Sequence, residues 1–175
     1  QLIFTEGALA QMGNESAFAV GDALPDAPEL AARGTYKVGV QTLEWVNKGQ
    51  INVLKSQEGV DPIYDRPIKV EVWYPATLSS GAQELETYNE VLGVANDKKR
   101  PLIPFTYAGR ALRNAPPQSA DKPFPLVVVS HGYPGSRLFL SYLTENLASK
   151  GYVVVAIDHT ESTFRDAAGF QSTLL

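Results

Sequence analysis

Two short polar segments of the sequence contain residue types that can do chemistry. Each directly follows an apolar run: residues 130–133 (SHGY) follow LVVV, and residues 158–161 (DHTE) follow VVVAI. The 2 histidines of the chain both lie in these segments. In open α/β sheets, ligands bind outside the carboxyl ends of the strands. The two segments are therefore the first candidates for a functional site.

The elements around these segments predict a βαβ unit. Residues 126–129 and 153–157 are apolar without alternation, which is typical of strands buried on both faces of a parallel sheet. Between them, Ser136 is a suitable N-cap, leucines recur three and four residues apart, and Gly151 supplies a stop. A right-handed βαβ crossover places both strand carboxyl ends on one edge of the sheet. We therefore expect both histidines at that edge.

One interpretation of the first segment is an oxyanion hole. Gly132 permits a tight backbone turn, the backbone N–H of Tyr133 is the candidate donor, and the positive end of the helix beginning near Ser136 faces the same place. A single such donor stabilises a tetrahedral transition state by about 3–4 kcal/mol. The ring of Tyr133 would then form a wall of the acyl pocket.

Two other interpretations compete for the histidines. His131, Asp158, His159 and Glu161 have ligand chemistry that suits zinc or manganese. Adjacent strand residues point to opposite faces, so Asp158 and His159 would both be ligands only if the strand has already ended. Alternatively, both histidine side chains only satisfy backbone groups of their loops. The residues alone leave all three interpretations open.

The sequence lacks the nucleophile of a serine hydrolase. No G-x-S-x-G occurs, and Ser130 cannot share a reaction point with His131 because neighbours on one strand diverge. There is no cysteine, which excludes thiolate catalysis and cysteine-ligated zinc. Read alone, the chain carries half of a catalytic site.

The rest of the chain is organised around this unit. Residues 1–34 predict an N-terminal arm, residues 36–46 and 68–74 alternate as strands with one covered face, and residues 76–123 form a long polar insertion with a short helix near 84–92. The net charge of -4 and the absence of a long apolar run argue against nucleic-acid binding and a transmembrane segment. A start at Gln1 without methionine favours a secreted or periplasmic protein.

At this point the sequence resembles a known family, the α/β-hydrolases related to platelet-activating-factor acetylhydrolase, including predicted dienelactone hydrolases. More distantly it is similar to cutinases and polyester hydrolases, in which an aromatic residue after the third strand gives the oxyanion N–H. Five blocks in the same order carry the resemblance: residues 33–43, 70–75, 108–117, 124–137 and 147–159.

The resemblance implies an α/β fold, specifically the N-terminal half of an α/β-hydrolase with a mixed, mostly parallel sheet flanked by helices. Residues 35–175 would supply strands one to four, with residues 76–123 as an insertion. The serine, acid and histidine of the triad would lie beyond Leu175, on a C-terminal fragment of the same polypeptide. In that family the third strand pairs with a fifth, so residues 127–129 would otherwise form an exposed apolar edge.

The expected function is therefore carboxylic-ester hydrolysis through an acyl-serine, without a cofactor or a metal. Tyr133 would supply the oxyanion N–H. A group of neighbouring residues would shape the loop or contact substrate: Gly132, His131, Arg137, Thr160 and Glu161. Small esters, short-acyl lipids and polyesters are all compatible substrates, and an aromatic surface from Phe105, Tyr107, Tyr133 and Phe164 would suit them. The rivals are a metal-dependent hydrolase using His131, His159 and Glu161, and a non-catalytic binding module on a hydrolase scaffold.

Overall fold

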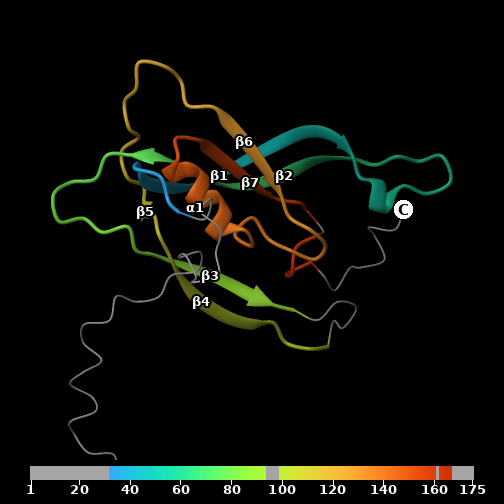
Figure 1. The fold of residues 1–175 in the computed structure, drawn as a ribbon. Coiled ribbons are helices and arrows are strands. Elements are labelled where there is room, and N and C mark those ends of the chain that lie inside the picture. The colour runs from blue at the N-terminus through green and yellow to red at the C-terminus, as the bar shows by residue number, and fades with distance from the viewer. Residues whose placement is uncertain (1–31, 94–98, 161, 167–175) are drawn as a thin grey trace, which may run out of the picture.

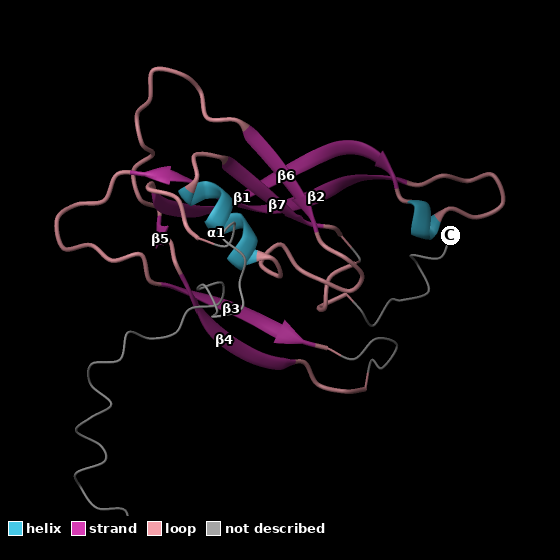
Figure 2. Ribbon diagram, in the orientation of Figure 1, coloured by secondary structure: helices cyan, strands magenta, loops and turns pink. Residues whose placement is uncertain are grey.

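The computed structural model describes residues 32–93, 99–160 and 162–166, so most of the predicted arm and Glu161 lie outside the described residues. One sheet has the strand order β5-β1-β2-β7-β6, and β3 and β4 form a second sheet (Figures 1 and 2). The strands are β1 (Lys37–Ile51), β2 (Ile63–Ala76), β3 (Glu86–Leu92), β4 (Ile103–Gly109), β5 (Leu112–Arg113), β6 (Leu126–Ser130) and β7 (Val153–Asp158); the helices are α1 (Ser141–Ser149) and a short 3-10 turn, η3 (Val53–Lys55).

The predicted α/β class and the mixed sheet are confirmed. The alternating segments form the antiparallel pair β1 and β2, and the continuous apolar runs form the parallel pair β6 and β7 with α1 between them. β7 lies between β2 and β6 and is antiparallel to β2. The patterns predicted the strands correctly, but the expected burial of both faces is wrong for β6, where Leu126 and Val128 are exposed within the described residues.

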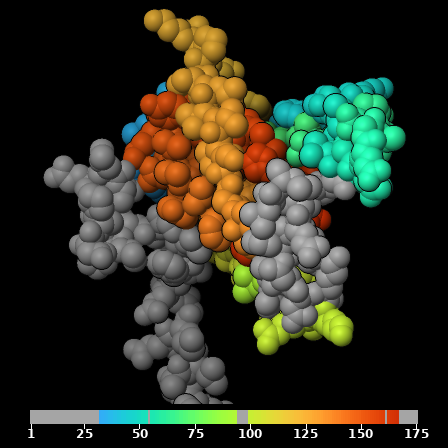
Figure 3. Space-filling view, turned by 90° about the vertical axis from the view of Figure 1, so that its right-hand side faces the viewer, coloured from blue at the N-terminus to red at the C-terminus, as the bar shows by residue number. Residues whose placement is uncertain are grey.

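Strands β1 and β2 are longer than the sheet that they anchor. β7 pairs only with residues 69–73 of β2, so the remainder of the pair continues as a two-stranded ribbon. In the space-filling view the end of this ribbon, in cyan and green, forms a lobe beside the main body (Figure 3). Trp45 and Val46 are exposed on it.

The helix near residues 84–92 was predicted wrongly, because this segment is strand β3. Tyr88 and Glu90 are buried while Asn89 between them is exposed, so the segment has the period of two that a half-covered strand requires. β3 pairs along its whole length with β4. The predicted insertion therefore contains a hairpin that packs beneath α1 and the main sheet (Figure 1).

Helix α1 also differs from its prediction. It begins at Ser141 rather than Ser136, and Ser136 instead caps a turn, where its Oγ accepts the Leu138 N–H at 3.1 Å. The helix buries small and polar side chains, among them Thr144 and Glu145, while Leu143 is exposed. The leucine spacing is therefore not the buried face, because the close approach of α1 to the sheet selects small residues.

A buried hydrogen-bond chain joins three elements of the core. Trp73 Nε1 on β2 donates to the Tyr88 hydroxyl on β3 at 2.8 Å, and that hydroxyl donates to Glu145 Oε1 on α1 at 2.7 Å. The second carboxylate oxygen of Glu145 accepts the backbone N–H of Arg110 at 2.8 Å. Burial and the neighbouring Glu145 raise the pKa of Tyr88, so the hydroxyl stays protonated and can donate.

Replacing Tyr88 with phenylalanine tests this chain. The change keeps the ring but leaves the Trp73 N–H and one Glu145 oxygen without their buried partner, so we expect a loss of about 1–3 kcal/mol in the free energy of unfolding. Urea denaturation measures it. Tyr142→Phe is the matched control, because Tyr142 lies on α1 and is exposed. Equal stability of the two variants would contradict the importance of the chain.

The edge of the main sheet is apolar. β6 is its last strand within the described residues, and Leu126 and Val128 are 64% and 60% exposed. Val129 points to the other side and packs against the core. Phe139 and Leu143, which precede and lie on α1, are exposed too. The apolar edge expected at residues 127–129 is thus present, and every second side chain of β6 is exposed there.

Candidate active site

The carboxyl ends of β6 and β7 bring the two histidines together. The rings of His131 and His159 are 4.9 Å apart between centroids, which agrees with their expected place on one edge of the sheet. His131 Nε2 lies 3.1 Å from the His159 backbone N–H, which donates to it, so His131 Nδ1 carries the proton and donates to the Gly132 carbonyl oxygen at 2.6 Å. Both nitrogens of His131 are therefore used to hold the two strand ends.

His159 makes a contact that the sequence did not predict. Its Nε2 lies 2.6 Å from Ser130 Oγ on the neighbouring strand. Burial, His131 and Arg66 lower the pKa of His159, which favours the neutral ring that can accept the serine proton. Sequence reasoning compared Ser130 only with the adjacent His131, whereas the parallel pairing of β6 and β7 places it against His159. Asp158, which precedes His159 in the sequence, binds Arg137 and therefore does not complete a catalytic triad with Ser130 and His159.

The loop that carries Tyr133 is fixed at its far end. The backbone of Gly135 donates to the Ser162 carbonyl at 3.2 Å and accepts from the Phe164 N–H at 3.0 Å. A Cβ at Gly135 would lie 2.7 Å from both the Gly132 carbonyl oxygen and His131 Nδ1, so this position must be glycine. Gly132 has open space around its Cβ position. The demand for glycine that the structure shows in this loop is therefore a steric one at Gly135, and neither Gly132 nor Gly135 has a positive φ.

Arg137 anchors the same loop to the sheet. Its backbone N–H and its Nη1 donate to the two oxygens of Asp158, each at 2.6 Å, and its Nε donates to Glu71 Oε2 at 2.9 Å. Glu71 lies fully buried on β2 and also binds Arg113 and the Thr42 hydroxyl. Two cations and a hydroxyl therefore satisfy a carboxylate in the interior. An arginine at this position shapes the loop rather than facing open solvent.

Thr160 and Glu161 were expected to border the site. Thr160 Oγ1 donates to the Pro67 carbonyl oxygen at 2.9 Å, which attaches the segment after β7 to β2. Glu161 lies outside the described residues. Among the residues that the structure describes, no group of three histidine or acidic side chains is arranged to hold a metal ion. No described helix is long and apolar enough to cross a membrane.

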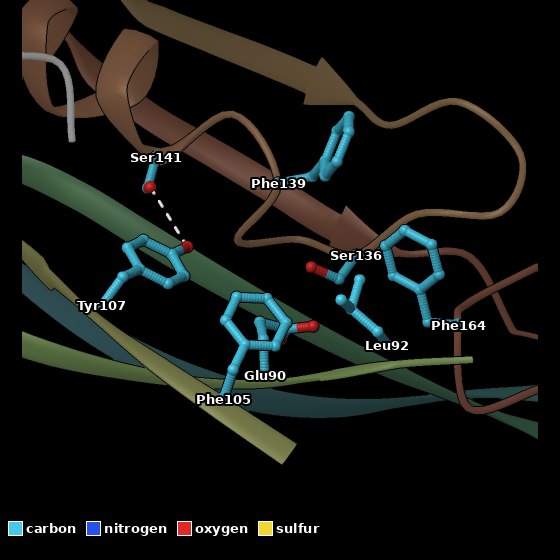
Figure 4. Close-up of a pocket in the computed structure, with 8 residues that line it drawn as sticks. All are labelled: Glu90, Leu92, Phe105, Tyr107, Ser136, Phe139, Ser141 and Phe164. Carbon is cyan, nitrogen blue, oxygen red and sulfur yellow. Dashed lines mark hydrogen bonds between the residues drawn. The ribbon is translucent and has the colours of Figure 1, made fainter. Parts of the chain in front are cut away.

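An aromatic pocket lies beside the loop, between the β3–β4 hairpin and the start of α1. Its volume is about 260 Å³ (Figure 4). Phe105, Tyr107 and Phe164 gather there as the sequence led us to expect, whereas Tyr133 does not line it. The lining residues are Glu90, Leu92, Phe105, Tyr107, Ser136, Phe139, Ser141 and Phe164. We refer to this set as the aromatic pocket.

Two polar groups hold the aromatic pocket in place. The Tyr107 hydroxyl donates to the Leu138 carbonyl oxygen at 2.8 Å and lies 3.2 Å from Ser141 Oγ, and burial raises the pKa of Tyr107 to about 12. Glu90 is only 9% exposed. Burial raises the pKa of Glu90, while a hydrogen bond with Ser136 and the charge of Arg137 lower it. Glu90 was not among the predicted site residues, because residues 84–92 were expected to form a surface helix and the burial of Glu90 follows from the β3 pairing.

Glu90→Gln tests the protonation of this carboxyl. A raised folded-state pKa means that the folded protein holds the proton more tightly than the unfolded chain, so wild-type stability falls as the pH rises through that pKa. We expect Glu90→Gln to be more stable than wild type at about pH 8 and to lose this advantage towards about pH 5, where a glutamate is nearer half protonation. Urea denaturation across this range measures the difference.

The control for that experiment is Glu44→Gln. The hydrogen bond and charge of Lys69 lower the pKa of the exposed Glu44, so any pH dependence of this variant has the opposite sign. A stability difference between wild type and Glu90→Gln that does not vary with pH would contradict the raised pKa.

Two comparisons show which known proteins this chain is similar to. The model of the family described as platelet-activating factor acetylhydrolase, isoform II, matches residues 31–172. The chain is also similar to a solved ferulic acid esterase from Streptomyces cinnamoneus, with 30% sequence identity and a TM-score of 0.49. That match covers 77% of this chain and 37% of the esterase chain, so the chain spans little more than a third of that protein's length.

Proposed function

The chain belongs to the platelet-activating factor acetylhydrolase, isoform II family, and from this membership we propose that it is the oxyanion-hole half of a serine carboxylic-ester hydrolase. The observation that carries the proposal is the anchored loop at the carboxyl ends of β6 and β7. Arg137 and Asp158 fix one side of this loop, and the backbone of Gly135 is paired with residues 162–164 on the other.

Fixed backbone donors are what an acyl-transfer site requires. In the proposed reaction, a serine hydroxyl attacks the ester carbonyl, and the carbonyl oxygen becomes an oxyanion that accepts the Tyr133 N–H. The tetrahedral intermediate expels the alcohol and leaves an acyl-serine, which water then hydrolyses. A donor already held in place stabilises the developing charge without reorganisation. His131 contributes by joining the two strand ends, and Arg137 by holding the loop.

The nucleophile, acid and base would come from a C-terminal part of the same polypeptide. The apolar edge of β6 supports this assignment, because an unpaired edge with Leu126 and Val128 exposed is a template for another strand. The complement would add its strand there and bring its serine to the carboxyl end of the sheet. Small esters, short-acyl lipids and polyesters remain the proposed substrates, entering beside the aromatic pocket.

Labelling the complete polypeptide with a fluorophosphonate tests this division of labour. The expected product carries one label on a serine C-terminal to Leu175 and none on Ser130 or Ser136, and labelling of Ser130→Ala is unchanged. Ser130 is the decisive position, because its contact with His159 makes it the best placed to react among the serines of the described residues. A label on Ser130 would overturn the proposal.

The two alternative functions, a metal-dependent hydrolase and a binding module, predict different results for the complete polypeptide. Loss of ester hydrolysis on chelation, with stoichiometric bound metal, would favour the metal-dependent reaction. No label and no hydrolysis in a folded complete polypeptide would favour a binding module.

A further inference from the structure

The aromatic pocket contains chemistry that the proposed ester hydrolysis does not use. Four rings line it: Phe105 and Tyr107 come from β4, whereas Phe139 and Phe164 come from the segments that flank the Tyr133 loop and β7. Phe105 and Tyr107 are stacked at 6.1 Å, and Phe139 and Phe164 meet edge to face at 6.1 Å. Figure 4 shows Phe105 and Tyr107 on one side of the space and Phe139 and Phe164 on the other, and Glu90 comes from the same hairpin as Phe105, its register partner.

The size of the pocket sets the size of its ligand. Its volume is about 260 Å³, whereas an apolar cavity of roughly 150 Å³ is enough to bind benzene. The space therefore suits one aromatic ring with a small substituent. Ring faces and ring edges are both presented by the lining, which is the arrangement that favours a further aromatic ring over an alkyl chain.

The charged groups around the pocket determine which net charge of the ligand is favoured. Glu90 is 9% exposed and faces a mixed set of charges: Arg137 and Asp158 near the loop, and Arg165 after it. A cationic ligand would need an ionised Glu90, which its burial opposes, and would face the two arginines. An anionic ligand would meet Glu90 and Asp158, while Arg137 is already bound to Glu71 and Asp158. A neutral ligand avoids both costs.

We propose that the aromatic pocket binds a neutral, single-ring aromatic molecule that carries a hydrogen-bond acceptor, and that the Glu90 carboxyl, which lines the pocket, donates to this acceptor. Ser136 lines the pocket together with Glu90. The four rings recognise the ring of the ligand, and Glu90 recognises its acceptor.

A pair of matched probes separates these two contributions. Acetophenone has a carbonyl acceptor, and α-methylstyrene has nearly the same shape without it. With the complete polypeptide, we expect acetophenone to bind more tightly than α-methylstyrene, measured by ligand-observed NMR titration. Glu90→Leu should weaken acetophenone binding about tenfold, the value of one hydrogen bond, and leave α-methylstyrene unchanged. Phe105→Ala should weaken both probes, and the exposed control Tyr142→Ala neither.

The pH dependence of acetophenone affinity distinguishes a donor role of Glu90 from a purely structural one. Acetophenone affinity should fall as the pH rises through the raised pKa of Glu90, because the carboxylate no longer donates. Glu90→Gln keeps a donor that does not titrate, so its affinity should stay constant over the same range. Tyr107, which borders the same space, stays protonated there because its pKa is about 12.

Three results would overturn the inference. They are no binding of either probe to the wild-type protein, equal effects of Glu90→Leu on both probes, and tighter binding of benzyltrimethylammonium than of acetophenone. None of the probes is an ester and the readout is not hydrolysis. Failure of this inference therefore leaves the proposed function standing, and a failed fluorophosphonate labelling leaves this inference standing.

Discussion

Replacing the backbone amide of Tyr133 with an ester is expected to lower kcat of the complete enzyme about 100- to 1000-fold. The substitution removes the N–H assigned to the oxyanion and keeps the tyrosine side chain, although it also makes the Gly132 carbonyl oxygen a weaker acceptor for His131 Nδ1. KM for a small aryl ester should change little, because the lost hydrogen bond strengthens only as charge develops on the carbonyl oxygen. Semisynthesis of the variant and steady-state kinetics provide the measurement.

Tyr133→Phe is the companion variant. It keeps the backbone N–H and loses only the ring hydroxyl, so kcat should stay close to the wild-type value. A backbone-ester variant that retains kcat within a few-fold of wild type would remove Tyr133 from the oxyanion hole. A large loss in Tyr133→Phe instead would assign the tyrosine hydroxyl a role that the proposed mechanism does not give it.

The second large effect is expected at Glu71. Glu71→Leu removes the buried carboxylate that holds both Arg113 and Arg137, which leaves two guanidinium groups without their shared partner. Breaking a buried ion pair from one side costs about 3–5 kcal/mol, and the partial exposure of the arginines places the expected loss near the lower value. Urea denaturation measures this loss. Because Arg137 also fixes the Tyr133 loop, kcat should fall as well.

Glu71→Leu combined with Arg137→Met tests whether the charge is the cause. Removing the cation together with the carboxylate leaves no unpaired guanidinium at residue 137, although Asp158 then keeps only the backbone N–H of that residue, so the double variant should recover part of the stability lost in the single one. Glu44→Gln is the surface control, since Glu44 pairs with Lys69 in solvent and should unfold as wild type does. A Glu71→Leu variant as stable as Glu44→Gln would contradict the role of the buried carboxylate.

The fold was predictable where the hydrophobic pattern of a segment is compatible with only one type of secondary structure. Alternation in residues 36–46 and 68–74 gave β1 and β2, and the continuous apolar runs gave β6 and β7. The region of β3 was misread because Glu84 to Leu92 contains residues that suit a helix, and only pairing with β4 makes it a strand. The sequence also does not show that α1 approaches the sheet through Thr144 and Ala148 rather than through its leucines.

The candidate site was predictable only in its position. Residues 130–133 and 158–160 meet at one sheet edge because both follow neighbouring parallel strands. The contacts within the site depend on partners far away in the chain: Ser130 on His159, Arg137 on Glu71, and Glu90 beneath Ser136. No local pattern encodes such pairs. Glu71 was hidden further because its strand is covered on both faces there, so a charged residue at an alternating position is interior.

Because β7 lies between β2 and β6, β6 can join the described sheet only after β7, although β6 is synthesised first. β6 precedes β7 in the chain, yet every hydrogen bond that attaches β6 to the described sheet goes to β7. A nascent chain can close the β1–β2 hairpin early, but residues 126–130 must wait as an extended apolar segment until residues 153–158 have emerged. Shortening the chain anywhere between them would therefore remove two strands from the sheet.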